Sequence, residues 1–185
     1  GHTIGFTPQH KQLPSDRRHF LRQTSRIGVL GATAAIFGYA AERALAEPTV
    51  RPIRLPITDL PIELEGLTIA QISDVHIGQL QGEDTYIQKI IATINALNVD
   101  IMTVTGDVVD GSVARLARSV EPLKNLKAKY GTYFVTGNHE YYSGAPAWIN
   151  HFKNLGWRVL ENEHDVLTIA THAVLLAGVH DLTAE

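Results

Sequence analysis

The fold of this 185-residue chain is decided by one stretch, Ile69-Ala70-Gln71-Ile72-Ser73-Asp74-Val75-His76. An apolar run typical of a buried strand ends here on an acid and an imidazole two residues apart. Side chains at i and i+2 of a strand point to the same face, so Asp74 and His76 are expected to reach one small object beyond the strand end. A carboxylate with an imidazole suits a divalent ion such as Mn, Fe, Co or Zn. Taken alone the pair is weak support, because Asp after a strand is more often a turn or helix N-cap residue.

The same arrangement recurs twice further along the chain. A strand predicted at residues 101–105 leads into Gly106-Asp107-Val108-Val109-Asp110-Gly111, and one predicted at 132–136 leads into Gly137-Asn138-His139-Glu140. In open α/β sheets, functional groups gather beyond the carboxyl ends of the strands. Turns and caps would explain any one of these motifs. They do not explain why three chemically matched clusters follow strands spaced by about 30 residues, the length of one βαβ unit.

Helical and strand patterns alternate through the rest of the chain. Helices are predicted at 85–97, 113–126 and 147–155, with Pro122 kinking or splitting the second. Besides the buried strand at 67–73, further strands are predicted at 50–55, 158–160, 166–169 and 173–179. This alternation predicts the α/β class, with a mixed, mostly parallel sheet flanked by helices. Apolar side chains at Ile101, Met102 and Val104 predict that both faces of their strand are buried.

Composition excludes several classes of protein and site. The formal net charge of −3 argues against a general nucleic-acid coat, so no nucleic-acid partner is expected. The sequence has no cysteine, which excludes disulfides and thiolate metal sites.

The first 46 residues differ from the rest. Residues 1–15 are polar and aperiodic, and we interpret them as unstructured, a tag or a remnant. Residues 16–46 place basic side chains, a short apolar region and the small-x-small site Ala44-Leu45-Ala46 in the order of a secretory signal. Arg17-Arg18 with the Phe-Leu-Arg that follows resembles the twin-arginine export signal, which implies that the export machinery binds this pair.

Two other interpretations of residues 16–46 compete with the export signal. The segment could be an uncleaved membrane anchor, although its fifteen apolar residues fall short of the ~20 that span a bilayer. It could also be a buried core helix, which the one-sided basic flank disfavours. The signal and the anchor both keep the basic flank in the cytoplasm. They therefore predict that the domain at residues 47–185 lies outside the cytoplasm, in the periplasm, at the cell wall or tethered to the membrane.

The three motifs together resemble those of the calcineurin-like metallophosphoesterases, and most closely the membrane-associated or exported bacterial members. That family's pattern is Asp-x-His, Gly-Asp-x-x-Asp and Gly-Asn-His-(Glu/Asp), followed by a lone His and Gly-His-x-His. The resemblance covers residues 67–185 and implies the first part of a two-sheet sandwich. The late histidines of the pattern do not occur in this sequence. We therefore interpret it as the N-terminal portion of such a protein and expect it, by itself, to bind metal poorly and to be inactive.

The resemblance also implies a role for each of six residues: metal ligation by Asp74, His76, Asp107 and Asn138, and catalysis by His139 and Asp110. Asp107 would bridge two divalent ions (Mn, Fe, Zn or Co), with a bridging hydroxide as the nucleophile. His139 would act as proton donor or charge stabiliser, oriented by Asp110. His180 is expected to be a loop residue, and Tyr141 and Tyr142 either line a substrate cleft or pack.

The function that follows is a dinuclear metal-dependent phosphoesterase acting on phosphomonoesters or phosphodiesters outside the cytoplasm. Lipid head-group or envelope phosphates are compatible substrates. One alternative is a non-catalytic metal- or phosphate-binding module that retains half of the ligands. Another is a one-metal hydrolase that uses Asp74, His76 and Asp107.

Overall fold

The computed structural model describes residues 28–38, 48–79 and 83–182, and the chain divides into two units, Gly1–Ala46 and Glu47–Glu185. In the first unit, residues 28–38 form a helix whose side chains are exposed. No helix within the described residues has the length and apolar character needed to cross a membrane. The predicted twin-arginine motif and the small-x-small site lie outside the described residues.

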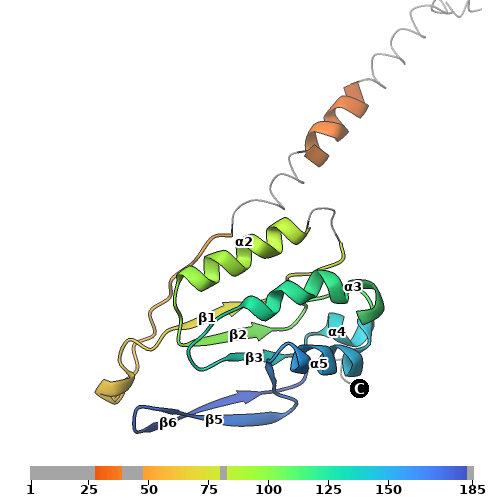
Figure 1. Cartoon of the computed structure of the whole chain (residues 1–185). Coiled ribbons are helices and arrows are strands. Elements are labelled where there is room, and N and C mark those ends of the chain that lie inside the picture. Colours follow the sequence, from red (N-terminus) through yellow and green to blue (C-terminus); the bar gives the residue numbers. More distant parts are fainter. Residues whose placement is uncertain (1–27, 39–47, 80–82, 183–185) are drawn as a thin grey trace, which may run out of the picture. The chain divides into compact units, whose positions relative to one another are not determined.

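A four-stranded parallel sheet forms the centre of the second unit (Figure 1). Its spatial order follows the chain: β1 (Ile69–Ile72), β2 (Ile101–Thr105), β3 (Thr132–Val135) and β4 (Arg158–Val159). The connections carry the helices α2 (Glu83–Ala96), α3 (Val113–Val120), α4 (Asn138–Ser143) and α5 (Ala145–Asn154). This confirms the predicted α/β architecture, and parallel pairing places the carboxyl ends of β1, β2 and β3 at one edge of the sheet.

Both faces of the central strand β2 are buried, as the sequence predicts. Met102 and Val104 join the larger core with side chains of α2, α3 and α5, so these three helices cover one face of the sheet. Ile101 packs on the opposite face with Tyr133 and Ile169. All three β2 side chains are fully excluded from solvent, which fits a strand covered on both sides.

A two-stranded antiparallel sheet covers part of that opposite face. It consists of β5 (Glu163–Ile169) and β6 (His172–Gly178) and forms no ladder with the parallel sheet in the described part of the chain (Figure 1). Side chains along both strands alternate between half-buried and exposed. Leu167 and Val174 contribute to the smaller core.

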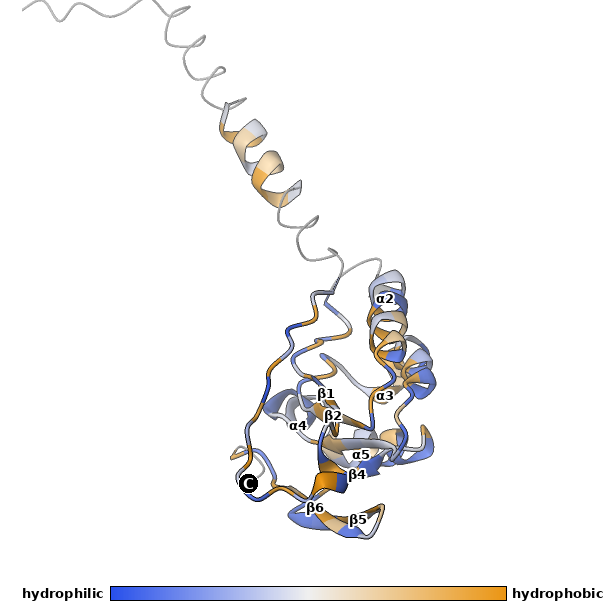
Figure 2. Ribbon diagram, turned by 90° about the vertical axis from the view of Figure 1, so that its left-hand side faces the viewer, coloured by the Kyte–Doolittle hydropathy of each residue, from blue (hydrophilic) through white to orange (hydrophobic). Residues whose placement is uncertain are grey.

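Two expectations about strands are wrong. Strand β1, predicted as a buried strand at residues 67–73, is an edge strand: among the described residues it pairs with β2 alone, and Ile69 is 54% exposed. Residues 50–55 form no strand, because their backbone pairs with no neighbour in the described residues, and Ile53 and Leu55 are exposed. Figure 2 shows hydrophobic and hydrophilic residues alternating along this extended segment. The alternation resembles that of a half-buried strand, which explains the error.

The observed helix boundaries differ from the predicted ones at two places. Pro122 splits the segment predicted as one helix, because α3 ends at Val120 and the 3₁₀-helix η2 (Glu121–Asn125) follows. Another short 3₁₀-helix, η1 (Ile62–Leu64), precedes β1. The six-residue α4 was not predicted. It begins at Asn138, so the third motif opens a helix directly after β3.

Candidate metal centre

The loops after β1 and β2 run side by side and extend the parallel ladder beyond the strands. The backbone N–H of Asp74 donates to the Gly106 carbonyl at 3.2 Å, and that of His76 donates to the Asp107 carbonyl at 3.0 Å. Asp74, His76 and Asp107 all have left-handed backbone conformations, with φ of 56°, 51° and 53°. Such conformations are uncommon for residues other than glycine and recur at functional sites.

This backbone corrects one expectation from the sequence. Asp74 and His76 were expected to share a face through strand alternation, but β1 ends at Ile72 and both residues follow it. Their left-handed turns bring the side chains together instead, with Asp74 Oδ1 3.8 Å from His76 Nε2.

Glycines allow the loops after β2 and β3 to touch. A Cβ atom at Gly106 would overlap the backbone of Gly137, and a Cβ atom at Gly137 would overlap the backbone and carboxylate of Asp107. Only glycine permits this approach. The contact brings the residues after Gly137 next to Asp107, and the His139 N–H donates to Asp107 Oδ1 at 2.9 Å.

Three side chains converge on one point, two from the loops after β1 and β2 and one from the first turn of α4. His76, Asp107 and His139 each offer a ligand atom, and these atoms lie within 4.8 Å of one another. The two imidazole rings meet edge to face, with centroids 4.4 Å apart. All three residues are partly buried, so a small ion could be held between them while remaining open to a ligand on one side.

Asp110 contacts the Nδ1 atoms of both imidazoles. Its Oδ2 lies 3.1 Å from His76 Nδ1, and its Oδ1 contacts His139 Nδ1. The Gln79 amide also donates to Asp110. Because Nδ1 of each ring faces Asp110, Nε2 of each ring can serve as a metal ligand or face a phosphate, the usual arrangement of carboxylate-oriented histidines.

The contact between Asp110 and His139 shifts the pKa of both residues. Burial acts to raise the pKa of Asp110, but hydrogen bonds from His139, His76 and Gln79 outweigh it and hold that pKa below its ordinary value. The hydrogen bond to Asp110 raises the pKa of His139, with Asp107 and Glu140 adding to the effect against the opposing influence of burial. Both shifts favour an ion pair of a carboxylate with a protonated imidazole.

Asp74 and Asn138 lie at the margin of the cluster. Asp74 is 65% exposed on its side chain. The Asn138 amide lies 3.0 and 3.2 Å from the two Asp107 carboxylate oxygens. With its nitrogen turned toward Asp107 the amide donates to both oxygens. With its oxygen turned that way, three oxygens face one another, an arrangement that a bound cation would stabilise.

The donor set therefore fits divalent metal ions. Imidazole nitrogens with carboxylate and amide oxygens suit Mn, Fe, Co and Zn. The structure brings all six predicted residues to one edge of the sheet. Asp110 contacts both imidazoles, which goes beyond the role implied by the resemblance.

Sequence reasoning missed two residues that support the site. Gln79 contacts Asp110, and nothing in its spacing distinguishes it from a loop residue. Glu140 is fully buried although it carries a carboxyl group, and its place in the third motif was the available signal.

Tyr141 and Tyr142 belong to α4, and His180 contacts Tyr141. The Tyr141 hydroxyl is 3.0 Å from both Thr136 Oγ1 and His180 Nδ1. His180 follows β6, as expected of a loop residue, and takes no part in the three-residue cluster. Tyr142 is 70% exposed, and its ring lies 5.6 Å from that of His139.

The sequence model for the calcineurin-like phosphoesterase family matches residues 67–183, a segment that includes all three loops. The chain belongs to this family. Metal binding is general among calcineurin-like phosphoesterases, which agrees with the cluster of His76, Asp107 and His139.

Relatives within the family come from animals and bacteria. A Danio rerio protein named as a transmembrane protein with a metallophosphoesterase domain is 34% identical over 167 residues, covering 88% of this chain and 38% of that protein. A Helicobacter pylori protein named as a metallophosphoesterase is 32% identical over 172 residues, covering 93% of this chain and 44% of that protein. A Bacillus subtilis metallophosphoesterase is 29% identical over 175 residues, covering 90% and 60%. The chain thus spans less than two thirds of each relative.

Proposed function

We propose that this protein is a metal-dependent phosphoesterase that holds two divalent ions and hydrolyses phosphomonoesters or phosphodiesters outside the cytoplasm. The observation that carries the proposal is the convergence of His76, Asp107 and His139 from the loops after β1 and β2 and from the start of α4. Membership of the calcineurin-like phosphoesterase family supports the reaction class.

The positions of the residues suggest which of them would bind each ion. Asp107 is central, because its carboxylate lies beside both the His76–His139 pair and the Asn138 amide, so it is suited to bridge two ions. Asp74 and His76 would hold one ion, and Asn138 the other. When bound, the ions supply an acidified water as the nucleophile and positive charge for the phosphate oxygens.

Proton transfer falls to His139. Its Nδ1 contacts Asp110, which favours the protonated ring, and its Nε2 can point toward the oxygen of the leaving group. A positioned imidazolium can donate a proton to a departing alkoxide. Asp110 would fix the orientation of this ring and of His76 at the same time.

The location and the substrate are inferred from the N-terminal segment and from the name of a relative. The order of basic and apolar residues in 16–46 supports export through Arg17 and Arg18 or tethering at a membrane, and one animal relative is named as a transmembrane protein. A site held close to a membrane favours a lipid or envelope phosphate ester.

One titration with a rate measurement tests the proposal. The full-length protein is stripped with EDTA, and Mn(II) is added stepwise while binding is followed by calorimetry and hydrolysis by the release of p-nitrophenol from mono- and bis-p-nitrophenyl phosphate. We expect two equivalents to bind and turnover to require both. Turnover that is complete at one equivalent would indicate a one-metal hydrolase. Binding without hydrolysis of either ester would indicate a non-catalytic module.

A further inference from the structure

Glu140 is the one fully buried charged side chain in the described part of the chain, with no exposed surface. Taking a carboxylate out of water costs several kcal/mol unless its oxygens are satisfied. No Lys or Arg is paired with Glu140 in the described residues. Burial of this acid costs free energy of folding, so its carboxylate is expected to hold other groups in place.

Three backbone N–H groups satisfy the Glu140 carboxylate. Its Oε1 accepts from Val108 at 2.8 Å, and its Oε2 accepts from Asp107 at 2.9 Å and from Gly137 at 2.8 Å. The Gly137 contact closes the first turn of α4. The other two contacts reach across to the loop after β2, more than 30 residues earlier in the chain.

The link between these two loops is reciprocal. Glu140 binds the peptide groups of Asp107 and Val108, while the Asp107 carboxylate accepts from the backbone N–H of His139. A side chain of α4 therefore holds the backbone of the loop after β2, and a side chain of that loop holds the backbone of α4. The Asp107 backbone is in the left-handed region, a conformation that persists only when its surroundings fix it.

We propose that Glu140 is a positioning residue: by holding the Asp107 and Val108 peptides, it fixes the direction in which the Asp107 carboxylate meets His76 and His139. The Glu140 carboxylate bonds to backbone N–H groups and is not one of the three clustered side chains. The inference rests on the proposed metal centre only for its effect on metal affinity, because the three hydrogen bonds form within the chain itself.

Glutamine at this position is a demanding test. Glu140→Gln preserves size and shape, but the amide offers one acceptor oxygen and an NH₂ group that can only donate. Facing three N–H donors, the amide must set donor against donor on at least one of them. The Asp107–Val108 peptides should therefore lose a partner although the side-chain volume is unchanged.

The experiment compares Glu140→Gln with a destabilised control, Met102→Ala. Met102 is fully buried in the larger core and belongs to β2, outside the motif segments, so its truncation lowers stability without touching the link. Two properties are measured on full-length protein under conditions where each variant is folded. These are hydrogen exchange of the Asp107 and Val108 amides without metal, and Mn(II) affinity by calorimetry.

For Glu140→Gln we expect faster exchange at these amides and a Mn(II) affinity weaker by about 10–100-fold, the range typical of residues that orient metal ligands. Met102→Ala should change neither property beyond its general loss of stability. If Glu140→Gln does not fold, Glu140→Asp is measured in its place, since it keeps both oxygens but is too short to reach both loops. We then expect the same direction of change.

Each other outcome is decisive. Unchanged exchange and affinity in the Glu140 variant would overturn the proposal. An equal loss of affinity in Met102→Ala would also overturn it, because Glu140 would then act only through stability. Absence of Mn(II) binding by the wild-type protein would contradict the proposed function, while the exchange measurement would still decide whether Glu140 holds the loop.

Discussion

Asp110 Oδ2 lies 3.1 Å from His76 Nδ1, and the other oxygen of the same carboxylate contacts His139. One acid therefore contacts two imidazoles, one from the loop after β1 and one from the first turn of α4. The two residues joined by the 3.1 Å contact are 34 positions apart in the chain. A change at Asp110 is thus expected to disturb the proposed metal ligand His76 and the proposed proton donor His139 together.

Asp107→Asn should abolish turnover and leave the fold nearly intact. The substitution removes the charge suited to bridging two ions, while the amide oxygen can still accept from the His139 N–H. Asp74→Asn is the matched control, and it should lower the rate less because Asp74 lies at the exposed margin and serves one ion. Steady-state rates on an aryl phosphodiester, with circular dichroism for the fold, check this. Substantial activity in Asp107→Asn would mean that two ions are not needed.

His139→Ala should slow hydrolysis by about 10²–10⁴-fold, the usual contribution of a general acid, and leave the bound metal in place. The reason is that the hydrogen bond to Asp110 raises the pKa of His139, which favours the protonated ring that can donate a proton. Elemental analysis of the purified variant beside its rate separates the two roles. A metal-free variant would make His139 a ligand, which its place in the three-residue cluster would also allow.

His180→Ala should leave Mn(II) affinity unchanged within a factor of about two. Nδ1 of His180 contacts the Tyr141 hydroxyl, and the residue is not among the three clustered side chains. Removal of this hydrogen bond should lower the free energy of unfolding by about 1 kcal/mol. Tyr141→Phe, which breaks the same contact from the other side, is the control. A large fall in metal affinity for His180→Ala alone would show that this histidine completes the site.

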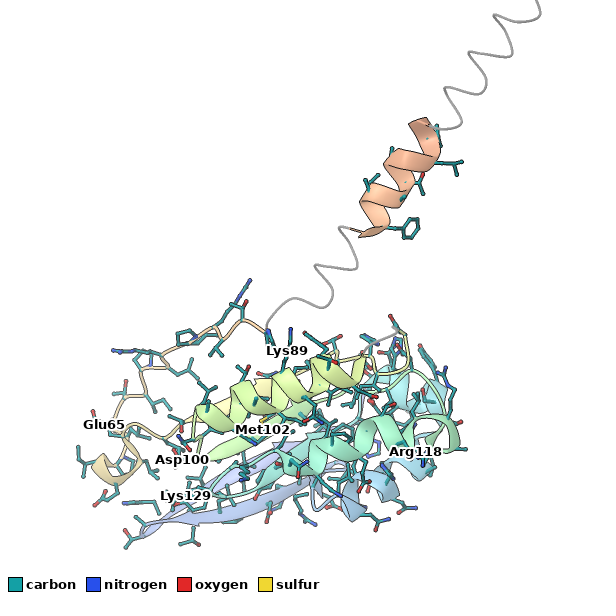
Figure 3. The ribbon with its side chains drawn as sticks, turned by 45° about the horizontal axis from the view of Figure 1, so that its top comes forward. Glu65, Lys89, Asp100, Met102, Arg118 and Lys129 are labelled. Atoms are coloured by element: carbon teal, nitrogen blue, oxygen red, sulfur yellow. The ribbon has the colours of Figure 1, made fainter. Side chains whose placement is uncertain are left out.

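Asp100→Ala should lower the free energy of unfolding by about 1–2 kcal/mol at neutral pH without affecting metal binding. Asp100 lies at the amino-terminal end of β2, away from the candidate centre, and accepts from the Thr68 N–H at 2.9 Å and the Thr68 hydroxyl at 2.7 Å. Figure 3 shows this end of the strand together with Glu65 and Lys129. Urea unfolding of both proteins measures the difference.

The Asp100 effect should also depend on pH. Hydrogen bonds from the Thr68 N–H, then from its hydroxyl, lower the pKa of Asp100 below the ordinary value of 3.8, with Lys129 adding to them. A lowered pKa means that the carboxylate stabilises the fold above 3.8 and that this contribution disappears as the pH falls through the folded-state pKa. The gap between wild type and variant should therefore close in acid. Glu65→Ala, which removes an exposed carboxylate with no hydrogen bond in the described residues, should show no such gap at any pH.

Replacement of both Arg17 and Arg18 by lysine should block export in the native host. Lysine keeps the positive charge, so any orientation by the basic flank is preserved and only specific recognition of the arginine pair is lost. Cell fractionation with detection of the protein decides the outcome. Export of the double variant as in wild type would favour an ordinary signal or an anchor over the twin-arginine signal.

The sequence by itself determined the fold class and which residues would gather at one edge of the sheet. Short apolar runs, helical stripes and glycine-acid motifs are local signals, so they placed β2 and β3 correctly within a residue and located the three segments that follow β1, β2 and β3 and carry the candidate residues. Parallel pairing then gathers those loops at one edge of the sheet, which is why six residues far apart in sequence could be predicted to lie together.

Only the tertiary structure decided how those residues are held. The exposure of β1 depends on its place at the sheet edge, and Asp74 and His76 converge through left-handed turns that no periodicity signals. Asp110 reaching His76 and Glu140 holding Asp107 are contacts across more than 30 residues. Such pairings follow from the register of neighbouring strands and from the close approach of Gly106 to Gly137, which are properties of the packed chain. These contacts cannot be read from the local sequence, because the hydrogen bonds form only when the segments that carry them are already side by side.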